Sequence, residues 1–255
     1  MDTGQQGLSL AKWHARYRQQ GIWSSSIQDY LFNQAHVGFH DKLVEVGSGT
    51  GAILEILSEK GYQSLTGVDI NHSSLFFAQQ SQFFCHLTQA DGYQLPFKAH
   101  TFKVSYCHYL LLWIDQPDQM LTEMRRVTEP GGYVMALAEP DHQARIDYPP
   151  PLDHLGELQT HALQGQGVDV QMGRQLRSLF QAVGLSDVQS GILGAQWSSK
   201  GTRDSTEWVM MKADLGGKLD EDSLAKYKQI DLQARRTGTR VLFVPTFFAL
   251  GKVPN

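Results

Sequence analysis

Cysteine is scarce in this chain, with only Cys85 and Cys107 among 255 residues. Two cysteines cannot build a disulfide framework, and neither stands at a spacing typical of metal ligands. Residues 1–20 are polar and lack the apolar segment of a secretory signal peptide. We therefore expect a cytoplasmic protein of a reducing compartment.

Long hydrophobic runs and basic runs are also missing. The longest strongly apolar stretch, residues 241–250, contains Pro245 and is ten residues long, whereas a membrane-spanning helix needs about 20. Lysine and arginine number 22 against 26 acidic residues, which gives a net charge of −4 without a basic stripe. These absences disfavour a membrane span and a nucleic-acid partner.

The chain does contain enough apolar material for a substantial core, with 41% hydrophobic residues. From residue 42 onward, short β-rich runs alternate with helical runs, and this alternation predicts βαβ units in a doubly wound α/β sheet. Strands are expected near residues 43–46, 64–69, 83–87, 103–107, 133–138, 188–193 and 240–250.

Two regions interrupt this alternation. Residues 8–37 have the pattern of two helices separated near residues 21–26. Three prolines at 149–151 introduce a helical insert at about residues 152–163. Further helices are expected at residues 173–183 and 219–235.

The most informative stretch is the glycine loop Gly47-x-Gly49-x-Gly51, between the first strand and a helix. Glycine permits positive φ and close approach of backbone to a ligand, and a helix start offers unpaired N–H groups. Asp69 ends the next strand, where a carboxylate can accept hydrogen bonds from both ribose hydroxyls. A nucleoside-containing ligand is therefore predicted. Because Gly47, Gly49 and Ala52 also satisfy the dinucleotide fingerprint, NAD stays open at this point.

Five stretches in strict order carry a family resemblance. They are the glycine loop with its strand (43–51), the acidic strand end (69–70), the turn at 90–97, the fourth-strand motif (102–108) and the helix and turn at 124–132. Together they resemble the class I S-adenosylmethionine-dependent methyltransferases, in the branch that acts on small molecules and in quinone biosynthesis. Five ordered motifs are far more specific than one glycine loop.

The resemblance implies an α/β, Rossmann-like, mostly parallel sheet of seven strands with the last strand antiparallel. It also implies S-adenosylmethionine as methyl donor, S-adenosylhomocysteine as product, and a small-molecule acceptor with an O, N or C nucleophile. A single domain is expected over residues 1–255, consisting of an N-terminal helical lid (1–41), a cofactor-binding core (42–140), a substrate-side helical insert after the fifth strand (141–170) and a C-terminal sheet completion (171–255).

Residue roles follow from the same resemblance. Backbone of the glycine loop packs against the methionine part and ribose, Asp69 holds the ribose hydroxyls, and Asp91 accepts from the adenine amino group. Ile70 and Tyr93 flank the adenine ring. The expected cofactor-binding residues are Tyr17, Trp23, Glu45, Gly47, Ser48, Gly49, Gly51, Asp69, Ile70, Asp91, Gly92, Tyr93, Cys107 and His108.

The chain also departs from the family pattern. Lys103 stands where many members have Asp, and Cys107-His108 replaces the small polar or acidic pair of the amino-methylating branches. The Asn/Asp-Pro-Pro-Tyr motif of those branches is absent. Methylation of DNA or of protein amides is therefore disfavoured.

An aromatic face on the first helix is the candidate lid. Leu10, Trp13 and Tyr17 share one side of that helix, and Trp23 follows. Aromatic faces near a sulfonium cation are favourable by about 0.5–2 kcal/mol. The alternative is that these rings only dock the helix on the domain.

The polar segment 139–148 is the expected substrate wall, because it leaves the fifth strand at the binding edge of the sheet. The candidate substrate-binding residues are Glu139, Asp141, Arg145 and Tyr148, and the candidate catalytic residues are Tyr17, His108 and His142. Histidine is suited to proton transfer near neutral pH.

No metal site is expected, because His36 and His40 are the only histidines at helical spacing and no third ligand is positioned by the sequence. Two other functions stay open beside methyl transfer. One is an NAD-dependent oxidoreductase, and the other is a non-catalytic nucleoside-binding module. A monomer or homodimer is expected.

Overall fold

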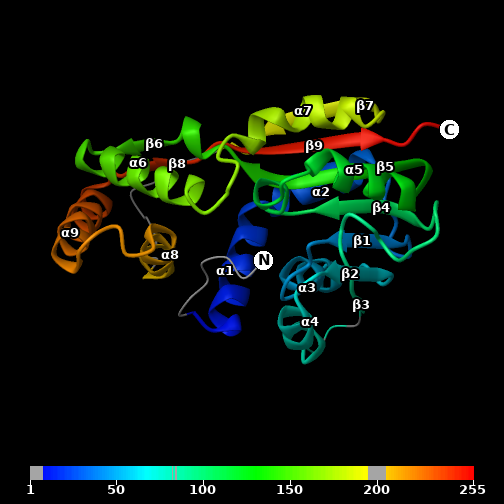
Figure 1. Ribbon diagram of the computed structural model, residues 1–255, viewed down its shortest axis with the longest axis horizontal. Coiled ribbons are helices and arrows are strands. Elements are labelled where there is room, and N and C mark those ends of the chain that lie inside the picture. Colours follow the sequence, from blue (N-terminus) through cyan, green and yellow to red (C-terminus); the bar gives the residue numbers. More distant parts are fainter. Residues whose placement is uncertain (1–7, 82, 84, 195–204) are drawn as a thin grey trace.

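The computed structural model describes residues 8–81, 83, 85–194 and 205–255. A sheet flanked by helices forms one part of the molecule, and a smaller lobe lies beside the carboxyl ends of its parallel strands (Figure 1). The N-terminal helix α1 (Leu10–Trp23) lies between these two parts. The functional cavities described below are in this region.

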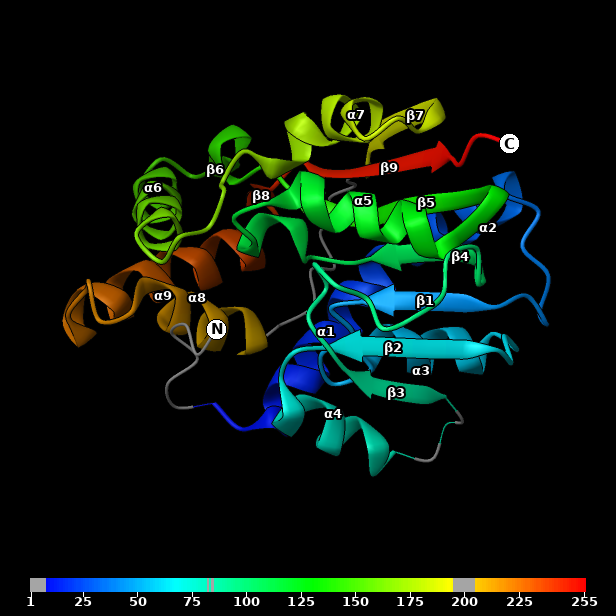
Figure 2. The same cartoon turned by 45° about the vertical axis from the view of Figure 1, so that its right-hand side comes forward.

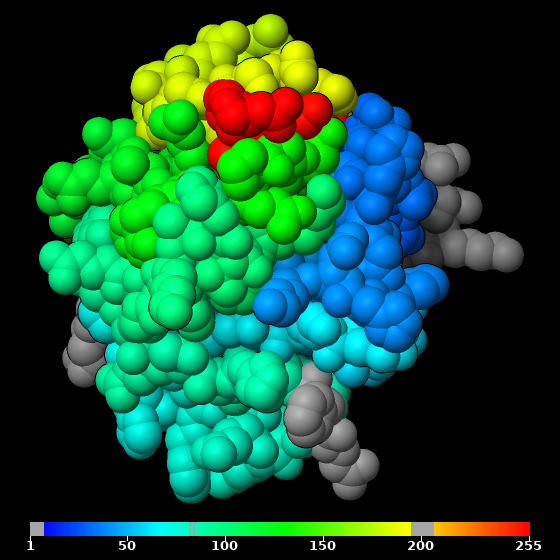
Figure 3. All heavy atoms as spheres, turned by 90° about the vertical axis from the view of Figure 1, so that its right-hand side faces the viewer, coloured from blue at the N-terminus to red at the C-terminus, as the bar shows by residue number. Residues whose placement is uncertain are grey.

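The large sheet has the strand order β3-β2-β1-β4-β5-β9-β7, and β9 is antiparallel to both of its neighbours (Figure 2). From the end of the sheet remote from the lobe, the C-terminal residues lie between the α7–β7 segment and β5 (Figure 3). The expected seven-stranded, mostly parallel sheet with an antiparallel last strand is confirmed. The strands are β1 (Leu43–Val46), β2 (Leu65–Asp69), β3 (His86–Gln89), β4 (Phe102–Cys107), β5 (Thr128–Pro140), β7 (Ser186–Ile192) and β9 (Thr246–Lys252).

Helices bury both faces of the sheet, because successive strand side chains point to opposite faces. Val134 and Ala136 belong to the apolar cluster under α5 and α7, whereas Met135 and Leu137 belong to the cluster under α2 and α3. All four are fully buried, as the near-continuous apolar run of β5 predicts. The helices of this part are α2 (Ser25–Gln34), α3 (Ala52–Glu59), α4 (His72–Gln79), α5 (Pro117–Val127), α7 (Met172–Ala182) and the short η1 (Leu111–Trp113) and η2 (His142–Ala144).

The two expected N-terminal helices are present and are separated at Ser24. Ser9 caps α1 by accepting a hydrogen bond from the backbone N–H of Lys12. Helix α1 packs closely on α3, since a Cβ atom at Gly21 would lie 2.5 Å from Ile56 Cδ1. The helix that was expected to form a lid is thereby held against the helix that follows the glycine loop.

The lobe contains β6 (Ile146–Tyr148), which pairs antiparallel with β8 (Val241–Phe243) in a second, two-stranded sheet. Helix α6 (Pro151–Gln164), the expected insert helix, packs against α8 (Ser205–Leu215) and α9 (Glu221–Thr237). The lobe has an apolar cluster separate from those of the large sheet, and its centre is formed by Leu152, Leu155 and Leu215.

Three expectations need correction here. The segment 240–250 is not one strand, because Pro245 separates β8 in the small sheet from β9 in the large one. Within the expected sheet completion 171–255, the part from α8 to β8 packs in the lobe and does not extend the large sheet. Strand β3 begins at His86, three residues later than expected. No helix in the described part of the chain has both the length and the apolar character needed to cross a membrane.

Candidate functional site

A cavity of about 350 Å³ lies at the carboxyl ends of β1 and β2, where the glycine loop meets α1. We call it the glycine-loop cavity. A ligand is predicted at this edge of the sheet, because ligands of doubly wound sheets bind in the crevice at the carboxyl ends of the parallel strands. Of the expected cofactor-binding residues, it is lined by Tyr17, Glu45, Gly47, Ser48, Gly49, Asp69, Ile70, Asp91, Gly92, Tyr93 and His108.

The glycine loop has the backbone that its sequence predicts. Gly47, Gly49 and Gly51 have φ of 74°, 49° and 76°. The N–H groups of Gly47 and Ser48 both donate to the carbonyl of Val68, so that the loop is fastened to β2. Gly51 caps α3 in the left-handed conformation, which leaves the start of that helix facing the cavity wall at Ala52.

Replacing Gly47 with alanine should lower the free energy of unfolding by more than the left-handed backbone at this residue alone explains. The added Cβ would lie 2.6 Å from Leu110 Cδ1, whereas a Cβ at Gly167, with φ of 87°, meets no atom within 4 Å. We expect Gly47→Ala to lower the free energy of unfolding by about 2–3 kcal/mol and Gly167→Ala by about 1 kcal/mol. Urea unfolding measures both, and equal losses would contradict the close approach of Leu110.

Asp69 is the best-placed carboxylate of the glycine-loop cavity. Its Oδ2 accepts a hydrogen bond of 2.7 Å from the N–H of Gly49, and its Oδ1 accepts one of 2.8 Å from the N–H of Asn71. Asp91 lies in the loop after β3, where its Oδ1 accepts a hydrogen bond of 2.9 Å from the N–H of Tyr93. Both carboxylates are therefore oriented by backbone before any ligand binds.

Glu45 and Ser48 leave buried polar atoms without partners on the same wall. Glu45 Oε2 and Ser48 Oγ have no hydrogen bond to any residue that the structure describes. Burial raises the pKa of Glu45 well above its ordinary value, and the negative charge of Asp69 raises it further. The buried Tyr106 hydroxyl interacts with the Glu45 carboxyl and opposes this rise in pKa. Buried unpaired polar atoms are costly, so Ser48 Oγ is the clearer place for a ligand group.

A second cavity, of about 620 Å³, adjoins the first and is enclosed by α1 and the lobe. We call it the insert cavity. Its wall combines apolar side chains such as Trp208 and Met211 with the charged groups of Arg16 and Arg145. Trp13, Gln20, Tyr109 and Asp214 line both cavities. The two spaces therefore meet at these four residues.

Three of the expected cofactor-binding residues do not line the glycine-loop cavity. Trp23 is half exposed, lies 4.8 Å from the Arg16 guanidinium and lines the insert cavity. Gly51 acts as the cap of α3. Cys107 is fully buried in the core, because its position on β4 faces the cluster under α5 and α7. Burial raises the pKa of its thiol.

Two residues of the expected substrate wall are buried structural groups. Glu139 is fully buried and accepts hydrogen bonds from the backbone N–H groups at the start of η1, those of its cap residue Leu110 and of Leu111 and Leu112. Burial raises its pKa to about 7, against the effect of these hydrogen bonds. Asp141, also buried, forms an ion pair with Arg174 of α7. Neither lines the glycine-loop cavity or the insert cavity.

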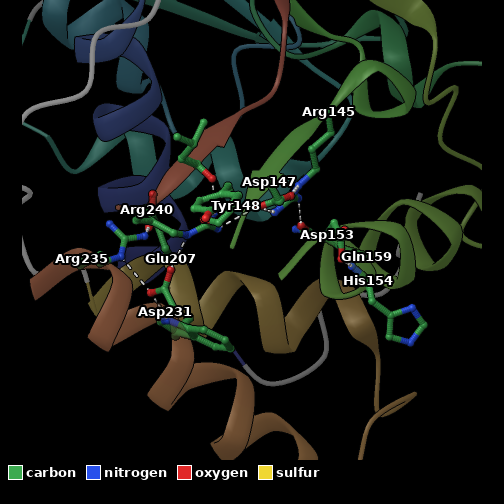
Figure 4. A network of polar contacts seen from close by, with 12 residues as sticks. Arg145, Asp147, Tyr148, Asp153, His154, Gln159, Glu207, Asp231, Arg235 and Arg240 are labelled. Carbon is green, nitrogen blue, oxygen red and sulfur yellow. Dashed lines mark hydrogen bonds and ion pairs between the residues drawn. The ribbon is translucent and has the colours of Figure 1, made fainter. Parts of the chain in front are cut away.

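Arg145 and Tyr148 belong to the polar network of the lobe (Figure 4). Arg145 is bonded to Asp147 and to the amide oxygen of Gln159, so its charge is already paired, although it lines the insert cavity. Tyr148 is half exposed on β6 and lines neither cavity. Of the four residues of the expected substrate wall, only Arg145 therefore lines either cavity, because β5 continues to Pro140 and the following residues tie the lobe to the sheet.

The candidate catalytic residues are divided between the two cavities. Tyr17 and His108 line the glycine-loop cavity, and His142 lines the insert cavity. His108 Nε2 lies 2.9 Å from Ser24 Oγ, and burial lowers its pKa to about 3. Burial, with the nearby charge of Arg145, lowers the pKa of His142 to about 4. Both imidazoles are therefore neutral near pH 7.

Residues that the sequence did not single out complete the site. The sequence indicates Gln20 and Tyr109 only weakly as site residues. Gln20 extends the aromatic face of α1, and Tyr109 directly follows His108. Nothing in the sequence indicates Asp214 as a site residue, because it lies on α8, a helix without a clear apolar stripe. No group of three or more metal-ligating side chains is found within residues 8–81, 83, 85–194 and 205–255.

Comparisons with known proteins match a family domain to the part of the chain that contains the glycine loop. The family described as "Methyltransferase domain" matches residues 44–136. Phosphatidylethanolamine N-methyltransferase of Cereibacter sphaeroides is 30% identical over 118 residues, which are 44% of this chain and 56% of that protein. The ubiquinone/menaquinone biosynthesis C-methyltransferase UbiE of Roseobacter denitrificans is 28% identical over 123 residues, or 46% and 48% of the two chains.

The fold similarity extends beyond the matched domain. Geranyl diphosphate methyltransferase, solved in complex with S-adenosylmethionine, superposes with a TM-score of 0.56 at 13% identity, over 90% of this chain and 85% of that chain. The chain spans between 34% and 56% of the length of the first curated relatives. Residues 44–136 thus match a methyltransferase domain, and the ordered motifs and the sheet around them are similar to those of the class I S-adenosylmethionine-dependent methyltransferases.

Proposed function

We propose that this protein transfers a methyl group from S-adenosylmethionine to a small-molecule acceptor bound in the insert cavity. The observation that carries the proposal is the shared wall of the two cavities, at Trp13, Gln20, Tyr109 and Asp214. A methyltransferase needs a donor site and an acceptor site that meet, because the reaction is an in-line displacement between two bound molecules.

The residues of the glycine-loop cavity fit the cofactor. Asp69 would hold the ribose hydroxyls and Asp91 the adenine amino group, with Ile70 and Tyr93 beside the ring. Ser48 Oγ, which has no partner in the described part of the chain, is available to a polar group of the cofactor. When bound, the cofactor supplies an electrophilic methyl group on a sulfonium whose leaving group is a neutral thioether.

The chain's own contribution is orientation and exclusion of water. Trp13 and Tyr17 stack at 5.7 Å and line the glycine-loop cavity from α1, so aromatic faces border the place where a cation would bind. Neutral His108, bonded to Ser24, joins α1 to the end of β4. Tyr17 and His108 are proposed to position the reacting groups, and His142 to contact the acceptor in the insert cavity.

The insert cavity favours an acceptor with both apolar and polar parts. Its volume of about 620 Å³ is within the usual range of small-molecule sites. Trp208 and Met211 supply apolar contacts, and Arg16 has no carboxylate within ion-pairing distance among the described residues. The similarity to phosphatidylethanolamine and quinone methyltransferases supports a small-molecule acceptor. A cytoplasmic location and a monomer or homodimer stay our predictions.

Ligand binding and turnover test this proposal. We expect S-adenosylhomocysteine to bind in calorimetry and to raise the melting temperature, while NADH does neither. A screen of phenols, carboxylic acids, amines and quinols with methyl-labelled S-adenosylmethionine should yield a labelled product. Stabilisation by NADH alone would indicate the oxidoreductase, and cofactor binding without methyl transfer to any compound would indicate the binding module.

A further inference from the structure

Asp214 occupies the junction between the donor and acceptor spaces. It lies near the end of α8 and lines both the glycine-loop cavity and the insert cavity. The other three residues at the junction are Trp13, Gln20 and Tyr109. A carboxylate is the strongest proton acceptor in this set at neutral pH, because tyrosine, glutamine and tryptophan side chains are far weaker bases.

The Asp214 side chain is held in place by helix α6. Its Oδ2 accepts a hydrogen bond of 2.6 Å from Gln159 Nε2, and its backbone carbonyl accepts one of 2.8 Å from Gln166 Nε2. The amide oxygen of Gln159 is bonded to Arg145, so the amide nitrogen must face Asp214. Asp214 Oδ1 has no hydrogen-bond partner in the described part of the chain, and this oxygen is available to a ligand.

The charges around Asp214 suit a group that changes its protonation state. Burial raises the pKa of Asp214 to about 6. The hydrogen bond from Gln159 and the charges of Arg16 on α1 and Arg145 beside β6 act in the opposite direction. The carboxylate is consequently ionised at pH 7 but close enough to its pKa to hold a proton briefly.

We propose that Asp214 is the general base of the reaction and takes the proton of an O–H or N–H acceptor bound in the insert cavity. This inference rests on the proposed methyltransferase function and narrows its acceptor class to protic nucleophiles. The O–H or N–H bond breaks, its proton passes to Asp214, and the electron pair of the nucleophile forms the new bond to the methyl carbon. The carbon–sulfur electron pair stays on sulfur, and Asp214 later releases the proton to water.

A carboxyl titration tests this role without knowledge of the acceptor. The protein is labelled with aspartate carrying ¹³C at the carboxyl carbon, and the Asp214 resonance is identified by its loss in Asp214→Asn. Its pKa is measured with S-adenosylhomocysteine, which is uncharged at sulfur, and with sinefungin, which carries an ammonium in place of the sulfonium. We expect the pKa to be lower with sinefungin by at least about 0.5, because a cation close to a carboxylate favours its ionised form.

The outcomes separate this inference from the function on which it rests. If calorimetry shows no binding of either nucleoside, the proposed function fails. If both bind and the pKa of Asp214 is the same with each, Asp214 is remote from the methyl group and the general-base role is wrong. Asp41 is the internal reference, because it accepts a hydrogen bond from the N–H of Gly38 and lines neither cavity.

Turnover of any acceptor found by the screen provides a second readout. We expect Asp214→Asn to lower kcat about 100-fold, the usual size of a general-base contribution, and to remove the acidic limb of the pH–rate profile near pH 6. Binding of S-adenosylhomocysteine and the melting temperature should change little. An Asp214→Asn enzyme with the wild-type pH profile would overturn the proposal.

Discussion

Replacing Asp69 with alanine is expected to weaken S-adenosylhomocysteine binding by about a hundredfold, because two charge-assisted hydrogen bonds at about 1.5 kcal/mol each are lost. The loss of affinity should also come from a change in the glycine loop. Asp69 also accepts from the N–H of Gly49, and this bond holds the glycine loop against β2. Calorimetry at fixed ionic strength measures the change.

The matched control for this variant is Asp29→Ala. Asp29 pairs with Lys60 on an exposed surface and lines neither cavity. Its loss should leave nucleoside affinity unchanged, since exposed pairs contribute about 0–1 kcal/mol even to folding. An Asp69→Ala protein that binds the nucleoside as tightly as the wild type would refute the assignment of the ribose site.

The second large effect concerns the lobe, where Asp231→Ala should lower the free energy of unfolding by about 3–5 kcal/mol. Asp231 is almost fully buried and accepts hydrogen bonds from Arg235 Nε, Arg240 Nε and Trp208 Nε1, at 2.8, 2.7 and 3.0 Å. Removing the carboxylate takes away the shared partner of two guanidinium groups and the acceptor of Trp208 Nε1 (Figure 4). Arg235 then keeps Glu207 and Arg240 keeps Asp147 as its ion-pair partner. Urea unfolding followed by tryptophan fluorescence reports on it, because Trp208 is one of the three donors.

The pH dependence of this stabilisation has a definite sign. Burial alone would raise the pKa of Asp231, but the hydrogen bonds from Arg235, Trp208 and Arg240 outweigh it and lower that pKa. Stabilisation by a carboxylate with a lowered pKa is present above the unfolded pKa, about 4, and is lost as the pH falls through the folded pKa. The difference between wild type and Asp231→Ala should therefore be constant from pH 5 to 8, by the same relation, and shrink below about pH 4.

A surface pair in the same lobe provides the comparison. Glu221 pairs with Lys212, and both side chains are more than half exposed. Glu221→Ala is expected to change stability by less than about 1 kcal/mol. Comparable losses in Asp231→Ala and Glu221→Ala would show that the buried network contributes no more than a solvated pair.

The sheet and the lining of the glycine-loop cavity could be predicted from the sequence because their signals are local. Asp69 directly ends an apolar strand, and Gly47, Gly49 and Gly51 stand at fixed offsets between a strand and a helix. Such spacing determines where the side chains emerge at the sheet edge. Eleven of the expected cofactor-binding residues accordingly line one cavity.

The acceptor side depends on contacts between distant segments. Glu139 has the polarity of a substrate ligand, yet three backbone N–H groups of η1 face it and the fold buries it completely. Asp214 and its partner Gln159 are 55 residues apart in sequence, and neither stands in a recognisable motif. Periodicity describes one helix at a time, so it carries no information on which helix side chains converge across the lobe.

The lobe is assembled from two stretches of chain, one that follows β5 and one that ends where β9 begins, and they are joined by the pairing of β6 with β8. We expect that neither stretch can be transplanted alone, because each would lose the strand partner and the apolar contacts that the other supplies. Grafting a new acceptor specificity from a related enzyme would require both segments to be exchanged together. During evolution, substitutions in one stretch should be accepted most readily when the other changes to match.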